Sequence, residues 1–284
     1  MKIGAHSWLL ETIYPLGEAM MRARAIGYDG YELDIGNFGG SGLGLQILPD
    51  RLQPAERQAI RDAAESAHIE MFSLCLGCLW HYPIAGNDDV YRVRGTEIIS
   101  AAVLLAKELG AKVILMPTYQ PEGVSEAEAW SNMLHSLESC VDLAEASGVT
   151  LAIENNIQPF LLRAADLARM VDEVASPAFR VYYDVANTSW IGIDPAAEII
   201  ELGDRIAQFH FKNRSSLRGT PGSEVVSVNM PGIVQFEPVM RAITEIGFDG
   251  RFVVEVPTLN KDAEFVAREN YEALKQLLST GSVL

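Results

Sequence analysis

Residues 149–184 read VTLAIENNIQPFLLRAADLARMVDEVASPAFRVYYD, and this stretch is the clearest guide to the fold. It opens with a short apolar run, Val149–Asn155, which predicts a strand. A helical stretch follows from about Ala164 to Val174, and a second apolar run, Arg180–Asp184, predicts another strand. Strands that are apolar almost throughout are typical of parallel sheets covered by helices on their faces. The stretch therefore predicts a strand–helix–strand unit with parallel strands.

The same alternation of strand and helix runs from one end of the chain to the other. Six further strands are expected at Lys2–His6, Tyr31–Asp34, Met71–Cys75, Lys112–Met116, Ile206–Lys212 and Arg251–Val256. The helices between and after them are expected at Leu16–Ile26, Pro54–Ala67, Asp89–Leu109, from Ser125 to Gly148, from Pro195, at Glu237–Ile246 and at Asp262–Leu278. Eight strand–helix units with no linker favour a closed barrel over an open sheet, which usually has fewer strands. The prediction is an α/β fold: one (β/α)8 TIM barrel domain over residues 1–284.

Composition narrows the function. The chain carries 22 basic and 38 acidic side chains, a formal net charge of −16. Such a surface repels phosphate backbones, which argues against nucleic acid as a partner. A signal peptide or an apolar run of membrane-spanning length is not apparent in the sequence, so we expect no membrane partner and a cytoplasmic location.

Polar residues end the last four predicted strands. Glu154, Asp184, His210 and Glu255 each follow an apolar run, where a strand buried on both faces should stay apolar. The C-terminal ends of barrel strands meet at one mouth. Three carboxylates gathered there would repel one another and lose hydration, and a divalent cation would remove both penalties. The four residues therefore predict a site for one divalent metal ion, with Mn²⁺ preferred and Mg²⁺, Co²⁺ or Zn²⁺ as alternatives.

At these motifs the chain resembles the xylose-isomerase-like barrel superfamily of sugar and sugar-phosphate isomerases and epimerases. The matching segments are Ala152–Asn155, Tyr183–Asn187, His210–Lys212 and Val254–Val256, and the likeness spans essentially the whole chain. The resemblance implies that the Glu, Asp, His and Glu in these segments ligate the metal and that the two glutamates also move protons. The pattern is similar to the ketose-phosphate 3-epimerase branch, although Asn213 stands where that branch usually has Asp.

Further polar residues are candidates for substrate binding. Lys212 either holds a substrate anion or pairs with the site carboxylates, and Asn187 is a candidate substrate contact or support for the metal ligands. Arg214 either contacts an anion or is solvated at the surface. His6 ends the first strand, where it lines the mouth or packs in the core, and Glu32 on the second strand is placed similarly.

The leading functional hypothesis is a metal-dependent epimerase or isomerase of a ketose or ketose phosphate. The metal ion would stabilise an enediolate, while Glu154 and Glu255 remove and return the proton. The same chemistry would serve a lyase, either a decarboxylase or a dehydratase of an oxidised or 3-oxo sugar acid. A damage-specific endonuclease needs more histidines and a basic groove, and a non-catalytic sugar-binding protein would show no turnover. The expected partner is a small carbohydrate, and a homo-oligomer is possible by analogy.

Overall fold

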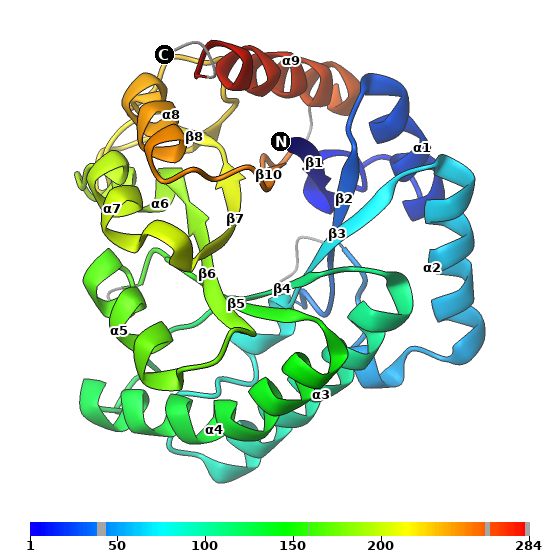
Figure 1. Cartoon of the computed structure of the whole chain (residues 1–284). Coiled ribbons are helices and arrows are strands. Elements are labelled where there is room, and N and C mark those ends of the chain that lie inside the picture. The colour runs from blue at the N-terminus through cyan, green and yellow to red at the C-terminus, as the bar shows by residue number, and fades with distance from the viewer. Residues whose placement is uncertain (39–43, 159, 259–261, 282–284) are drawn as a thin grey trace.

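A closed parallel barrel lies at the centre of the molecule, with helices around it (Figure 1). The computed structural model describes residues 1–38, 44–158, 160–258 and 262–281. The barrel strands are β1 (Lys2–His6), β2 (Gly30–Asp34), β3 (Glu70–Cys75), β4 (Val113–Met116), β5 (Thr150–Glu154), β6 (Phe179–Asp184), β7 (Ile206–Phe211) and β10 (Arg251–Val254). Their order around the barrel is β1-β10-β7-β6-β5-β4-β3-β2. The predicted (β/α)8 barrel is therefore confirmed.

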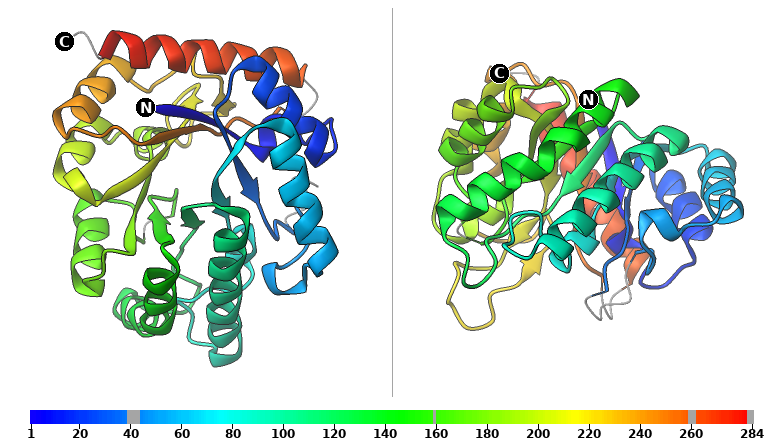
Figure 2. Two further views of the ribbon diagram at one scale, coloured as in Figure 1. Left: turned by 45° about the vertical axis from the view of Figure 1, so that its right-hand side comes forward. Right: turned by 90° about the horizontal axis from the view of Figure 1, so that it is seen from below.

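Helices follow the strands and cover the outside of the barrel (Figures 1 and 2). They are α1 (Leu16–Ile26), α2 (Pro54–Ala67), α3 (Asp89–Leu109), α4 (Glu126–Ser147), α5 (Ala164–Val174), α6 (Val185–Trp190), α7 (Pro195–Leu202), α8 (Phe236–Glu245) and α9 (Ala263–Gly281). Short 3-10 turns occupy Ser7–Leu9, Pro49–Arg51, Gly77–Trp80 and Gly203–Arg205. None of the helices in the described ranges is long and apolar enough to cross a membrane.

Besides the 3-10 turns, one helix and two short strands were not expected from the sequence. Helix α6 begins directly after β6, and a small antiparallel pair, β8 (Asn213–Arg214) and β9 (Val225–Val226), occupies the long loop after β7. All three are too short to produce a periodic hydrophobic pattern, so they could not be predicted from the sequence.

Alternation along the strands sends successive side chains into the barrel interior and into the apolar layer under the helices. On β7, Phe209 and Phe211 are fully buried among other aromatic rings, including those of Phe252 and Phe236. The residue between them, His210, points into the barrel instead, since successive side chains of a strand face opposite sides. This alternation delivers strand-end polar groups to one mouth of the barrel.

Candidate metal and substrate site

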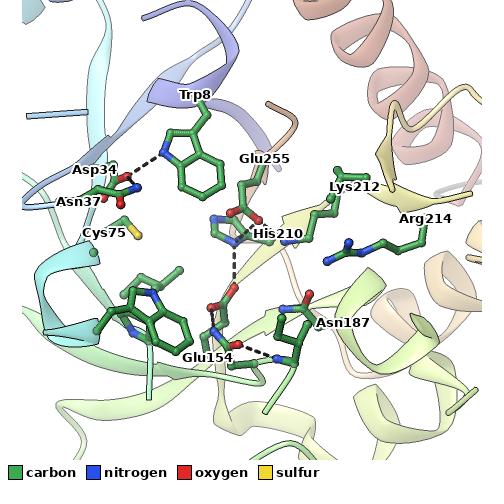
Figure 3. Close-up of a pocket in the computed structure, with 17 residues that line it drawn as sticks. Trp8, Asp34, Asn37, Cys75, Glu154, Asn187, His210, Lys212, Arg214 and Glu255 are labelled. Atoms are coloured by element: carbon green, nitrogen blue, oxygen red, sulfur yellow. Dashed lines mark hydrogen bonds and ion pairs between the residues drawn. The ribbon is translucent and has the colours of Figure 1, made fainter. Parts of the chain in front are cut away.

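A cavity of about 260 Å³ opens at the C-terminal ends of the barrel strands. This volume is near the lower end of the range for small-molecule sites. Trp8 and Asp34 lie on one side of the cavity, and Lys212 and Arg214 lie on the other (Figure 3). Small polar ligands therefore fit this mouth better than large apolar ones.

The four residues expected to bind metal come together, and three of them, Glu154, His210 and Glu255, line this cavity. Glu154, Asp184, His210 and Glu255 each offer one ligand atom, and these atoms all lie within 4.8 Å of one another. Nδ1 of His210 is 3.3 Å from an oxygen of Glu154, 3.3 Å from one of Glu255 and 3.9 Å from one of Asp184. Both glutamates contact this same nitrogen, and in the view of Figure 3 Glu255 lies above His210 and Glu154 lies below it.

Asp184 is held in place by the start of helix α6. Its Oδ1 accepts hydrogen bonds from the backbone N–H groups of Ala186 at 2.7 Å and Asn187 at 3.0 Å, so Asp184 is the N-cap of the helix. The side chain of Asn155 accepts from the Asp184 N–H at 2.6 Å and donates to the Asp184 carbonyl at 2.8 Å. These hydrogen bonds use Oδ1 and the backbone groups of Asp184, so its second carboxylate oxygen, Oδ2, faces the other residues of the cluster.

Lys212 pairs with the site carboxylates, one of the two roles considered for it. Its ammonium lies 2.6 Å from Asp184 Oδ2 and also contacts Glu255 Oε2. Burial opposes the charged form of Lys212, but Asp184 and Glu255 outweigh this and raise its pKa. Burial likewise opposes ionisation of Glu255, but Lys212 and His210 lower the pKa of this carboxyl to about 2.

The donor atoms fit a divalent ion. Four buried carboxylates face one ammonium group, that of Lys212, and one imidazole, that of His210. The carboxylates are those of Glu154, Asp184, Glu255 and the deeper Glu32. Although it is buried, Asp184 Oδ2 has no hydrogen-bond partner in the described chain beyond its ion pair. Three carboxylates and one imidazole suit Mn²⁺, Mg²⁺, Co²⁺ or Zn²⁺.

The other predicted substrate contacts differ in their positions. Asn187 lines the cavity, and its amide donates to the Asn155 carbonyl at 3.0 Å. Arg214 also lines it, with the guanidinium 4.3 Å from the Trp190 ring centroid and a buried Nε that has no hydrogen-bond partner among the described residues. His6 is absent from the described lining of the cavity, and its ring lies in the barrel interior, 5.8 Å from that of His210. The core position considered for His6 is the one that the structure shows.

Asp34 is a cavity residue that the sequence reasoning missed. Its Oδ2 accepts hydrogen bonds from Trp8 Nε1 at 2.7 Å and from Asn37 Nδ2 at 2.9 Å. Burial raises the pKa of this carboxyl to about 7, against the opposing effect of both hydrogen bonds. Asp34 ends the second predicted strand, so the strand-end signal that identified Glu154 and Asp184 was present here too.

The fold and the cluster together define a (β/α)8 barrel whose C-terminal mouth holds a buried group of three carboxylates and one imidazole that could bind a metal ion. The family model described as xylose isomerase-like TIM barrel matches residues 21–277, and the chain belongs to that family. The resemblance inferred from the motifs is thus confirmed.

Relatives of the chain include epimerases of sugar phosphates. The 2-epi-5-epi-valiolone 7-phosphate 2-epimerase of Actinoplanes sp. is 31% identical, over 75% of this chain and 72% of that protein. A putative L-ribulose-5-phosphate 3-epimerase of Escherichia coli is 30% identical over 72% of each chain. A solved structure of L-ribulose 3-epimerase superposes with a TM-score of 0.79 at 19% identity, covering 99% of this chain and 95% of that one. These names give no support to the lyase alternative.

Proposed function

We propose that the protein is a divalent-metal-dependent epimerase or isomerase of a small ketose or ketose phosphate. The observation that carries the proposal is the convergence of Glu154 and Glu255 on His210 Nδ1, one from above and one from below in Figure 3, in the lining of a polar cavity. Membership in the xylose isomerase-like family and the epimerase activities named for the relatives support it.

Glu154, Asp184, His210 and Glu255 would hold the ion, with Mn²⁺ as our preferred choice. When bound, the ion supplies Lewis acidity that makes the hydrogen next to a ketose carbonyl easier to remove. Each carboxylate has two oxygens, so a glutamate that gives one of them to the ion keeps the other for proton transfer.

Glu154 and Glu255 are the proposed proton-transfer pair. Epimerisation requires that a proton leaves one face of a carbon atom and that another arrives on the opposite face, which two carboxyl groups on opposite sides can perform. Asn156 Nδ2 donates to Glu154 Oε2 at 3.2 Å, and Lys212 pairs with Glu255 Oε2, so a polar neighbour orients each carboxylate. Isomerisation would use the same groups to deliver the proton to the adjacent carbon.

Lys212, Asn187 and Arg214 are the proposed substrate contacts. Arg214 is the candidate for an anionic substituent such as phosphate, because its buried Nε has no hydrogen-bond partner in the part of the chain that the structure describes and its guanidinium packs on Trp190. The phosphorylated substrates named for the relatives support this assignment. His6 is left out of the contacts, given its place in the barrel interior.

The test is turnover of Glu154→Gln and Glu255→Gln on a panel of ketoses and ketose phosphates in deuterated water with Mn²⁺. We expect wild-type protein to incorporate deuterium without loss of mass, and each variant to lose about 10²–10⁴-fold in rate. Glu138→Gln, on the exposed face of α4, is the matched control and should keep wild-type activity. A fully active Gln variant would remove that glutamate from the mechanism, and product formed only with loss of carbon dioxide or water would replace the epimerase with a lyase.

A further inference from the structure

Glu32 lies beneath the proposed metal site, in the interior of the barrel. It is in the middle of β2 and fully buried. Its Oε2 accepts hydrogen bonds from Ser73 Oγ at 2.5 Å and from the Tyr182 hydroxyl at 2.7 Å, while Oε1 is 2.6 Å from His210 Nε2. A buried carboxylate with this many partners is held rigidly, because each lost contact would leave a charge unpaired in the core.

The direction of each hydrogen bond follows from the count of hydrogens. The amide Nε2 of Gln208 donates one hydrogen to Ser73 Oγ at 2.8 Å and one to the Tyr182 hydroxyl at 2.7 Å. Each hydroxyl therefore accepts from the amide and has its single hydrogen free to donate to Glu32. Glu32 is thus an acceptor toward both hydroxyls, which is the role of an ionised carboxylate.

The third partner of Glu32 must then be a donor as well. An ionised carboxylate only accepts, so His210 Nε2 carries a hydrogen and donates it to Glu32. The other ring nitrogen, Nδ1, faces Glu154 and Glu255 at 3.3 Å each. A neutral His210 held in this way presents the lone pair of Nδ1 to the centre of the cluster.

The neighbouring histidine does not take over this role. His6 Nδ1 accepts a hydrogen bond from the Trp8 N–H at 3.1 Å, so the hydrogen of its neutral ring is on Nε2. That Nε2 is 3.6 Å from Glu32 Oε1, beyond a normal hydrogen bond, and has no partner in the described chain. Glu32 is therefore bonded to His210 and only loosely associated with His6.

We propose that Glu32 is a positioning residue that fixes the ring orientation and tautomer of His210, so that Nδ1 is available to the ion. This inference rests on the proposed metal site and adds a residue to it. Groups that hold the second nitrogen of a metal-binding histidine commonly change metal affinity by about 10–100-fold when they are replaced.

Glu32→Gln is the informative variant because it keeps the shape of the side chain. If its NH2 group faces His210, Nε2 must accept and the ring hydrogen moves to Nδ1, where it blocks the ion. If the NH2 group faces Ser73 and Tyr182, the hydrogens of these two hydroxyls lose their acceptor, because Gln208 also meets them as a donor. Ser73→Ala is the matched control, since it removes one bond to Glu32 without touching His210.

The experiment measures Mn²⁺ binding to metal-free protein by the electron paramagnetic resonance signal of free Mn²⁺, with urea unfolding as a check on the fold. We expect Glu32→Gln to weaken Mn²⁺ binding by about 10-fold or more and Ser73→Ala by less than about threefold. Equal affinity of Glu32→Gln and wild type, or an equal loss in Ser73→Ala, would overturn the positioning role alone. A wild-type protein that binds no Mn²⁺ would instead overturn the proposed metal site.

A second measurement needs no variant. In Co²⁺-loaded wild-type protein, the proton NMR spectrum should show one strongly shifted ring N–H resonance that exchanges slowly with solvent, because His210 Nε2–H is buried against Glu32. Loss of this signal before the first spectrum can be recorded in deuterated water would contradict the proposal. This test also works if the Glu32→Gln variant does not fold.

Discussion

Replacing Lys212 with methionine removes the ammonium that now pairs with two carboxylates of the proposed metal site. Lys212 Nζ is 2.6 Å from Asp184 Oδ2 and in contact with Glu255 Oε2, and all three side chains are buried. A divalent ion at the cluster would use the same two carboxylates. The ammonium and the ion therefore repel each other while they share their partners.

The size of the effect follows from this geometry. Removing one partner of a buried ion pair costs about 3–5 kcal/mol, because the other charge is left uncompensated. Metal-free Lys212→Met should lose about this much in its free energy of unfolding. A bound divalent ion compensates the same carboxylates, and recovery of about 2 kcal/mol would correspond to roughly 30-fold tighter metal binding by the variant.

Urea unfolding with EDTA and with saturating Mn²⁺ measures both parts of this prediction. The difference in unfolding free energy between wild type and Lys212→Met should be smaller in Mn²⁺ than in EDTA. The decrease should equal RT times the logarithm of the ratio of the two Mn²⁺ dissociation constants. Lys112→Met, at an exposed lysine, is the control and should change stability by no more than about 0.5 kcal/mol. A gap of the same size in both conditions would refute the reasoning that Lys212 and the ion share carboxylates.

Three further predictions concern the framework of the barrel. Burial raises the pKa of Glu11 from 4.5 to about 7, so its neutral form stabilises the fold below pH 4.5 and this contribution is lost as the pH rises through 7. The loss is at most about 3 kcal/mol, and Glu11→Gln should lack it when urea unfolding is compared at pH 5 and pH 8. Gly30→Ala would place a Cβ 2.1 Å from the Phe72 ring, and we expect thermal and urea unfolding to show a loss of about 1–3 kcal/mol. Asn155→Ala removes the two hydrogen bonds to the backbone of Asp184, which should cost about 1–3 kcal/mol in urea unfolding and weaken Mn²⁺ binding as well.

Much of the barrel could be predicted from local sequence, because each strand and helix leaves its own pattern. The predicted helix at Ala164–Val174 matches α5, and the strand at Lys2–His6 matches β1. The helix predicted from Ser125 to Gly148 matches α4, where the Ser125 side chain accepts from the Glu128 N–H at the N-cap. The strand-end rule placed the four cluster residues at one mouth, since parallel strands share the direction in which they end. Asp34 obeys the same rule and was missed because no family motif drew attention to it.

The polar network under the cluster lies beyond such local rules. Glu32, Ser73, Tyr182 and Gln208 each occupy an inward position of an otherwise apolar strand, and taken singly each is compatible with an ordinary structural contact. Their partners are fixed only by closure of the barrel: β2 and β6 lie four strands apart in either direction, so the bond from Tyr182 to Glu32 spans the interior. A sequence pattern records which face of a strand a residue occupies, but not which strand stands opposite. The buried charge of Glu32 therefore becomes intelligible only in three dimensions, where its hydrogen bond to His210 connects it to the imidazole of the proposed metal site.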